Sequence, residues 1–174
     1  NSMSAAQREN SLIIYIGYNG TATQVAQSPY LSSKVKSTLY QGGINVPMFI
    51  CGKGVTRIGM ENNLIDATDL YSTIAEVAGV NVTSINDSKS FKSLFTNSST
   101  IRNYKYTEIK DGTDDMWAIS NGKYKLIVNA TGTKELYFLT TDPYELTNLI
   151  NGTLNAEQTA AKNSLETELS IIRR

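Results

Sequence analysis

The chain contains no histidine, and it has only one cysteine and three prolines among its 174 residues. Without histidine, these residues cannot form a Ser-His-Asp triad, a Cys-His pair or a His-ligated zinc site. A single cysteine excludes a disulfide within the chain. The 16 basic and 16 acidic side chains cancel, so we expect no broad electrostatic binding of nucleic acid. No apolar run approaches the roughly 20 residues of a membrane span, so none is expected.

The first half of the chain has the strand, loop, strand, helix order that is typical of an α/β sheet. Residues 11–17 (SLIIYIG) are a continuous apolar run rich in β-branched residues. Such a run predicts a buried strand, internal and parallel to its neighbours. Residues 46–51 (VPMFIC) predict a second strand. The stretch between them contains Pro29 and a Gly-Gly pair, and we expect it to be irregular.

Residues 69–78 have the apolar spacing of an amphipathic helix. Its stripe consists of Leu70, Ile74, Val77 and Ala78. Thr68 is the expected N-cap, and Gly79 is placed to end the helix. Residues 81–103 are polar, apart from Phe91, Leu94 and Phe95, whose spacing predicts one short docked helical turn.

The second half of the chain predicts a small antiparallel sheet of four strands. The strand candidates are residues 104–109, 115–120, 123–129 and 134–139. They are separated by the turn dipeptides Asp111-Gly112, Asn121-Gly122 and Thr131-Gly132. Asp142-Pro143 predicts a helical turn in which Asp142 is the cap and Glu145 completes a capping box. A last helix is expected over residues 155–172, with the stripe Ala161, Leu165, Leu169 and Ile172 against the sheet.

The fold class predicted from this order is α/β, in two parts. We expect residues 1–80 to form an α/β core and residues 104–174 to form a small antiparallel α+β subdomain. Residues 81–103 are expected to connect these two parts.

Two positions could carry chemistry on the loops between the first two strands. Asn19 follows the first strand, and its side-chain oxygen is a suitable ligand for a hard cation, although an ordinary Asn-Gly turn would have the same sequence. Lys34 and Lys36 precede the Gly-Gly pair. A lysine there could hold an anionic ester group, or it could simply be solvated.

The remaining candidates favour structural interpretations. Cys51 ends an apolar strand and is expected to be a buried thiol, since no nearby group would activate it. An acidic patch could bind calcium or form a glycosidase pair, but a solvated turn is the simpler interpretation. It consists of Glu108, Asp111, Asp114 and Asp115.

A second group of candidates is aromatic. Trp117, Tyr124 and Tyr137, with the Asn121-Gly122 turn, could line a sugar-binding face. Packing between the sheet and its helix is the alternative. Tyr40, beside the Gly pair, is assigned neither role by local rules.

Four stretches together resemble the C-terminal part of sulfatases of the alkaline phosphatase superfamily. LIIYIGYNGT (12–21) is similar to the strand that ends in the family's Asp-Asn-Gly metal motif, and KSTLYQGGINVP (36–47) is similar to its Lys-Gly-x-Leu-Tyr-Glu-Gly-Gly-x-Arg-Val-Pro stretch. DATDLYSTIAEVAGV (66–80) resembles the helix that follows. KELYFLTTDPYELTNLI (134–150) resembles Glu-Leu-Tyr-Asp-Leu followed by Asp-Pro-x-Glu-x-x-Asn-Leu. The weaker WAISNGKYKLI (117–127) fits between them, and the order is that of the family.

The resemblance implies a sulfuric ester hydrolase that uses a formylglycine nucleophile and a divalent cation, usually calcium. On matching positions, Asn19 would be a calcium ligand and Lys36 would contact the sulfate group. The implied substrate is a sulfated small molecule or glycan. The implied location is periplasmic or secreted.

Several family features are absent from this sequence. No Cys or Ser has the formylglycine motif, and Cys51 is followed by Gly-Lys-Gly. Tyr18 occupies the usual Asp ligand position, and tyrosine is a poor substitute for a carboxylate ligand to calcium. Gln41 and Asn45 stand where the family usually has Glu and Arg. The nucleophile region is expected upstream, so the sequence predicts a C-terminal fragment that is inactive alone.

Two other functions fit the same resemblance. A phosphate mono- or diester hydrolase would use the same metal scaffold, and a non-catalytic binding module would explain Tyr18. A truncated α/β half would also expose a sheet edge and an apolar face. We therefore expect self-association, or pairing with an N-terminal half.

Overall fold

The computed structural model describes residues 3–80, 85–110 and 115–174. The chain divides into two compact units by its internal contacts. Unit 1 consists of Asn1–Gly17 and Pro47–Asn103, and unit 2 consists of Tyr18–Val46 and Tyr104–Arg174. The loops between the first two strands thus belong with the C-terminal sheet, although they were grouped with residues 1–80 from the sequence. The domain boundaries at residues 80 and 103 stay a prediction.

Unit 1 is built on two antiparallel strands, β1 (Leu12–Ile16) and β2 (Met48–Gly52). Leu12 lies opposite Gly52, and Ile16 lies opposite Met48. The prediction of a parallel, buried first strand is therefore wrong. Alternate residues of β1 are exposed, although they are apolar. An apolar residue on both faces of a strand is typical of a buried parallel strand, and this pattern misled the sequence interpretation.

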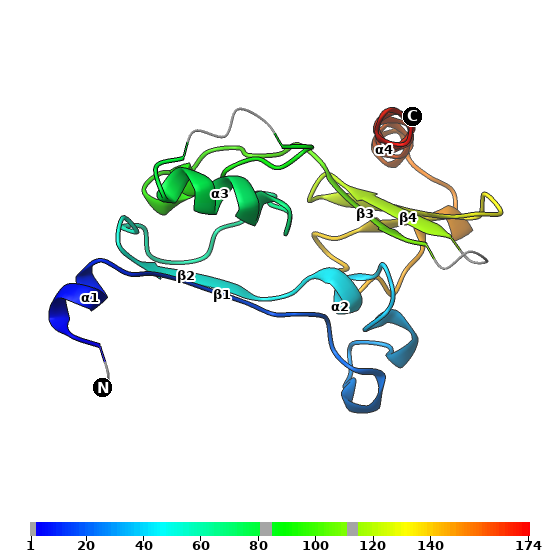
Figure 1. Ribbon diagram of the computed structural model, residues 1–174. Helices are drawn as coiled ribbons and strands as arrows, with labels where there is room; N and C mark the ends of the chain where they lie inside the picture. Colours follow the sequence, from blue (N-terminus) through cyan, green and yellow to red (C-terminus); the bar gives the residue numbers. More distant parts are fainter. Residues whose placement is uncertain (1–2, 81–84, 111–114) are drawn as a thin grey trace. The chain divides into compact units, whose positions relative to one another are not determined.

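The core of unit 1 lies between this strand pair and two helical segments, α3 (Asp69–Val77) and the 3-10 turn η3 (Lys92–Phe95). Figure 1 shows α3 in green on one side of β1 and β2. Phe91, Leu94 and Phe95 are buried there, as the spacing of residues 81–103 predicted. Half-buried residues from β1, β2 and α3 pack against them, among them Leu12, Met48, Ile50 and Leu70. A short helix, α1 (Ala5–Glu9), precedes β1.

Helix α3 ends one residue earlier than the predicted range of residues 69–78, and of the predicted apolar stripe only Leu70 packs against the core. Its buried residues are Asp69, Ser72 and Thr73, whereas Ile74 and Val77 of the apolar stripe are exposed. Thr68 makes no side-chain cap hydrogen bond. Gly79 ends the helix as predicted, with φ at +78°. The helix therefore turns a polar face toward the core of unit 1, where an ion pair of Asp69 satisfies it.

Unit 2 contains the predicted antiparallel sheet, in the order β3-β4-β5-β6. Its strands are β3 (Lys105–Ile109), β4 (Met116–Ser120), β5 (Tyr124–Asn129) and β6 (Lys134–Phe138). The turns at Asn121-Gly122 and Thr131-Gly132 place their glycines at positive φ, as turns between antiparallel strands require. The Asp111-Gly112 turn lies outside the described residues.

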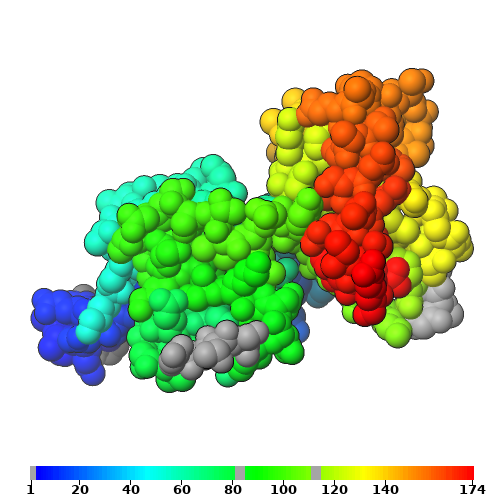
Figure 2. All heavy atoms as spheres, turned by 90° about the horizontal axis from the view of Figure 1, so that it is seen from above, coloured from blue at the N-terminus to red at the C-terminus, as the bar shows by residue number. Residues whose placement is uncertain are grey.

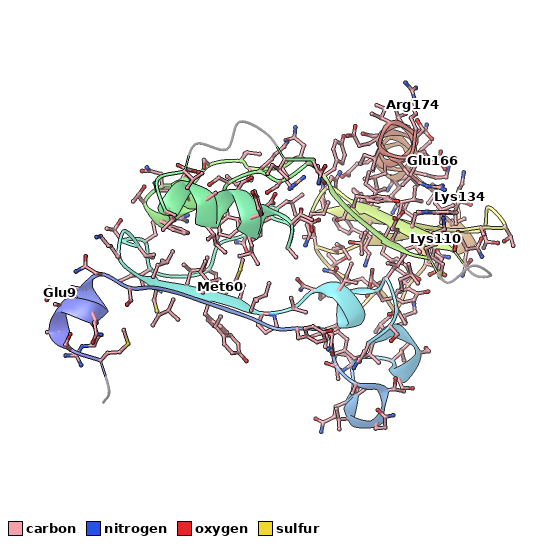
Figure 3. All side chains as sticks on the ribbon, viewed as in Figure 1. Glu9, Met60, Lys110, Lys134, Glu166 and Arg174 are labelled. Atoms are coloured by element: carbon pink, nitrogen blue, oxygen red, sulfur yellow. The ribbon has the colours of Figure 1, made fainter. Side chains whose placement is uncertain are left out.

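Helix α4 (Ala156–Ile172) packs on one face of this sheet. Leu165 and Leu169 are buried against Ile119, Leu126 and Leu136. The outer side of α4, orange to red in Figure 2, is uncovered within unit 2. An ion pair of Lys134 in β6 with Glu166 in α4, at 2.7 Å, joins the helix to the sheet, and both residues are labelled in Figure 3. The predicted stripe is confirmed except at Ile172, which is 42% exposed.

Unit 2 also contains the short segments η1 (Thr23–Val25), η2 (Ser32–Lys34), α2 (Gln41–Ile44) and η4 (Leu149–Asn151). The stretch expected to be irregular thus contains one turn of α-helix at the Gly-Gly pair. None of the helices in the described ranges is both long and apolar enough to span a bilayer.

Candidate functional site

Backbone hydrogen bonds bring Asn19 and Lys36 onto neighbouring loops of unit 2. The N–H of Lys36 donates to the carbonyl of Thr21 at 2.8 Å. The N–H groups of Gly20 and Thr21 donate to the carbonyls of Gly43 and Gly42 at 3.0 and 3.1 Å. We call residues 19–21 and 36–43 the paired loops. The side chains of Asn19 and Lys36 are both exposed, so the fold presents an amide and an ammonium group to solvent on adjacent backbone segments.

Glycines make this close approach of the paired loops possible. A Cβ atom at Gly20 would lie 2.0 Å from the carbonyl oxygen of Gly42, and one at Gly43 would lie 2.3 Å from that of Thr38. Both contacts are with backbone, which cannot rotate away. Ser37 has φ at +68°, a left-handed conformation that favours glycine. This explains why the motif that the stretch resembles has glycine at that position.

We expect Gly20→Ala to destabilise unit 2 by about 1–3 kcal/mol, because the added methyl group has no room beside Gly42. The matched control is Gly152→Ala, whose Cβ would find its nearest neighbour at 3.8 Å. Urea unfolding followed by the fluorescence of Trp117 measures both variants, since it is the only tryptophan. Equal stability of the two variants would show that the loops separate without cost.

Lys34 and Lys36 have different environments, which the sequence could not distinguish. The Nζ atom of Lys34 donates to the Tyr137 hydroxyl at 3.0 Å and to the carbonyl of Glu145 at 2.5 Å. It also lies 4.6 Å from the ring centre of Tyr40 and 4.7 Å from that of Tyr137. Lys34 is therefore neither a solvated lysine nor available to a substrate. Lys36 is the exposed lysine of the two.

The carboxylate of Glu135 in β6 holds the two tyrosines that surround Lys34. Glu135 accepts hydrogen bonds from the hydroxyl groups of Tyr40, at 2.8 and 2.9 Å to its two oxygens, and of Tyr137. Burial, and then the negative charge of Glu135, raise the pKa of both phenols above their usual range. Tyr40, which local rules left unassigned, is thus a neutral donor to a carboxylate.

Glu145 is fully buried and pairs with the equally buried Lys125, whose Nζ atom lies 2.7 Å from its Oε1 atom. Its Oε2 atom accepts the N–H of Gln41 at 2.5 Å. Burial lowers the pKa of Lys125, although the charge of Glu145 opposes this shift. Glu145 has φ at +57° and does not complete a capping box, so that prediction is wrong. A lysine within the apolar run YKLIV was the available signal for a buried partner.

The other polar residues of this stretch bind backbone. The carboxylate of Asp142 accepts from the N–H groups of Leu146 and Thr147 at 2.9 and 2.8 Å, but residues 143–147 form no helix, so the prediction that it caps a helical turn is wrong. The Oδ1 atom of Asn148 accepts from the N–H of Leu136 at 3.0 Å. The stretch that resembles Asp-Pro-x-Glu-x-x-Asn-Leu therefore builds the support of the paired loops rather than a reactive centre.

The calcium site implied by the resemblance has little basis in these residues alone. Asn19 offers one amide oxygen, and the side chain of Tyr18 is 97% exposed. Within residues 3–80, 85–110 and 115–174, no group of three or more acidic or cysteine side chains could hold a metal ion. Since calcium takes about six to eight oxygen ligands, the donors present do not fit a complete calcium site.

Among the remaining candidates, the structure describes Cys51, Glu108 and Asp115. Cys51 is exposed, so the prediction of a buried thiol is wrong. In the acidic patch, Glu108 is exposed and accepts the Tyr106 hydroxyl at 2.5 Å, and Asp115 is half-buried. Asp111 and Asp114 lie outside the described residues.

The aromatic candidates are packed rather than arranged as a sugar-binding face. Tyr124 and Tyr137 are buried on the sheet. The guanidinium of Arg173 lies 3.3 Å from the ring centre of Trp117. The side chain of Asn121 accepts the N–H groups of Lys123 and Tyr124, which closes the turn with Gly122.

Comparison with solved structures identifies the class of this fold. The chain superposes on a sulfatase-like protein of Bacteroides thetaiotaomicron with a TM-score of 0.78 at 20% identity, covering 95% of this chain and 37% of that one. For BT4656, solved with its substrate D-glucosamine-2-N,6-O-disulfate, the TM-score is 0.76 at 20% identity, with coverages of 96% and 35%. The phosphonate monoester hydrolase of Agrobacterium radiobacter gives 0.60 at 18% identity, with coverages of 79% and 31%.

The fold is that of the C-terminal part of sulfatases in the alkaline phosphatase superfamily. Residues 35–174 match the family described as N-sulphoglucosamine sulphohydrolase, C-terminal, and the chain belongs to that family. It spans a little over a third of the length of the first two of these structures. A sequence search of curated proteins gives no match.

Proposed function

We propose that this chain is the C-terminal part of a metal-dependent sulfatase that acts on a sulfated small molecule or glycan, and that it contributes Lys36 to the sulfate site. The observation that carries the proposal is the separation of roles between the two loop lysines. Lys34 is bound by Tyr137 and Glu145, which leaves the Lys36 ammonium exposed on the paired loops beside the segment of Asn19. The disulfated substrate of BT4656 supports sulfate as the anion.

The role of the described residues is to bind and orient a charged group. A lysine ammonium is a compact point charge with three donors, suited to a tetrahedral anion. Asn19 would add one oxygen ligand to a calcium site that the rest of the enzyme must complete. No residue of this chain has the formylglycine motif. The isolated chain should therefore bind sulfate weakly and hydrolyse nothing.

Titration of the isotope-labelled chain with inorganic sulfate tests the proposed role of Lys36. We expect millimolar binding with amide shifts centred on the paired loops, and Lys36→Ala should abolish these shifts. The matched control is Lys89→Ala, which removes an exposed lysine of unit 1 and should leave them unchanged. Binding that survives Lys36→Ala, or chelator-sensitive release of sulfate from an aryl sulfate, would contradict the proposal.

A phosphate or phosphonate ester hydrolase is the second candidate, favoured by the likeness to the phosphonate monoester hydrolase. Lys36 would hold a phosphoryl group by the same charge. Tighter binding of phenyl phosphate than of phenyl sulfate, measured by the amide shifts of the paired loops, would favour this candidate.

The apolar face of β1 and β2 supports the proposal that further protein covers unit 1. Ile13, Tyr15 and Phe49 are 54%, 62% and 66% exposed. They lie on one face, because Tyr15 is opposite Phe49 and Ile13 is opposite Cys51. In Figure 3, side chains project from both faces of this strand pair, and α3 covers one of them. The occupant that we propose is the N-terminal part of the enzyme.

We expect the chain to self-associate at micromolar concentration when that part is absent, because an exposed apolar strand pair with free edges favours association. Light scattering measures the mass. Tyr15→Lys, which places a charge on this face, should shift the chain toward monomer, and Val25→Lys, at a 65% exposed position of unit 2, is the control. A monomer for the unaltered chain would contradict the expectation.

A further inference from the structure

Glu145 contacts three different segments at once through its own acceptor atoms. Its Oε2 atom accepts the N–H of Gln41, its Oε1 atom pairs with Lys125, and its backbone carbonyl accepts from Lys34. The side chain is 0% exposed. A turn residue does not need a buried carboxylate with these partners, so the contacts of Glu145 indicate an additional role.

The contact with Gln41 lies at the start of α2, which has little intrinsic stability. The helix has four residues, two of which are glycine, and Tyr40 at its N-cap position gives no side-chain cap hydrogen bond. Glycine is among the weakest helix formers, and the first N–H groups of any helix need an external acceptor. The carboxylate of Glu145 is that acceptor, supplied from residues far along the chain.

A continuous set of backbone contacts joins this helix to the site. The carbonyls of Gly42 and Gly43 in α2 accept from Thr21 and Gly20, and the carbonyl of Thr21 accepts from Lys36. Displacement of α2 would therefore displace both loops. The Tyr40 hydroxyl, bound by Glu135, supports the residue directly before Gln41.

We infer that Glu145 is a positioning residue for Lys36. Its carboxylate, paired with Lys125, caps α2 and thereby fixes the paired loops in the geometry that presents Lys36 and Asn19. The inference rests on the proposed function only in assigning Lys36 to the anion. Whether the paired loops keep a fixed conformation can be measured without any ligand.

Hydrogen exchange of backbone amides in the full chain tests this role. In Glu145→Met combined with Lys125→Met, the buried charges are removed together, so the fold is retained, but no acceptor faces Gln41. We expect the amides of Gln41, Thr21 and Lys36 to exchange at least tenfold faster, with those of β5 within twofold of the unaltered chain. Glu145→Gln combined with Lys125→Met returns a neutral acceptor and should restore protection at these three amides.

Glu166→Gln is the matched control, because that carboxylate also pairs with lysines in unit 2 but contacts neither loop. Unchanged protection of the paired loops in the double Met variant would overturn the inference, and so would an equal loss throughout β5. The inorganic sulfate titration separates the two claims. Ordered loops that depend on Glu145 but bind no sulfate would refute the proposed function and leave the positioning role intact.

Discussion

Asp69→Ala should destabilise unit 1 by about 3–5 kcal/mol, the usual cost of breaking a buried, hydrogen-bonded ion pair by removing one partner. Asp69 is fully buried. Its carboxylate accepts from the Nε and Nη2 atoms of Arg102 at 2.7 and 2.5 Å. It also accepts the N–H groups of Asp66 and Lys89 at 2.8 and 2.7 Å. One substitution therefore removes the acceptor of two backbone N–H groups and of a guanidinium whose side chain is only 9% exposed and which keeps only its contacts with Asp87.

Urea unfolding followed by the amide signals of α3 measures this loss. The control is Glu76→Ala, which removes an exposed carboxylate of the same helix that lies 3.7 Å from Lys92. An exposed pair of this kind contributes at most about 1 kcal/mol. A similar small effect for Asp69→Ala would show that Arg102 and the two N–H groups find water instead.

The same ion pair makes the stability of unit 1 depend on acid. Burial by itself would raise the pKa of Asp69, but the hydrogen bonds from Arg102 and from backbone outweigh it and lower that pKa below its ordinary value. A carboxyl group with a lowered folded pKa contributes stability in full above its unfolded pKa, near 4. This contribution is lost as the pH falls through the folded pKa. In Asp69→Asn, the free energy of unfolding, measured in urea at a series of pH values, should therefore fall less steeply below about pH 4 than in the unaltered chain.

The second large effect is expected at Lys125 and Glu145 in unit 2. Lys125→Met or Glu145→Met alone should cost about 3–5 kcal/mol, because each leaves the other charge buried without its partner. The two single costs should not add, since the residues are in contact. The double substitution should cost only about 1–3 kcal/mol, the penalty for the unpaired N–H of Gln41.

A double-mutant cycle in urea, read by the fluorescence of Trp117, measures this coupling. The control pair is Lys123 and Glu157, whose charged groups are 2.6 Å apart but whose side chains are 54% and 60% exposed. Single substitutions there should change stability little, because exposed pairs are well solvated. Additive costs at Lys125 and Glu145 would mean that the two charges do not depend on each other.

The secondary structure of unit 2 could be predicted because its signals are local. Turn glycines such as Gly122 and Gly132 and the alternation of the four strands require no knowledge of the rest of the chain. The bounds of α3 and α4 followed from apolar spacing in the same way. Motif order was also sufficient to recognise the sulfatase family, which the family match confirms. The roles of Asn19 and Lys36 stay a prediction.

Local sequence signals predicted the four strands of unit 2, the two longer helices and, through the order of the motifs, the family. Tertiary structure decided which faces are covered, so the apolar residues Ile13 and Ile74 and the thiol of Cys51 are exposed in the described chain. It also decided that Lys34 is bound while Lys36 is exposed, because the partners of Lys34 lie more than a hundred positions away. Periodicity records which residues are apolar, but only folding brings distant charges such as Lys125 and Glu145 together.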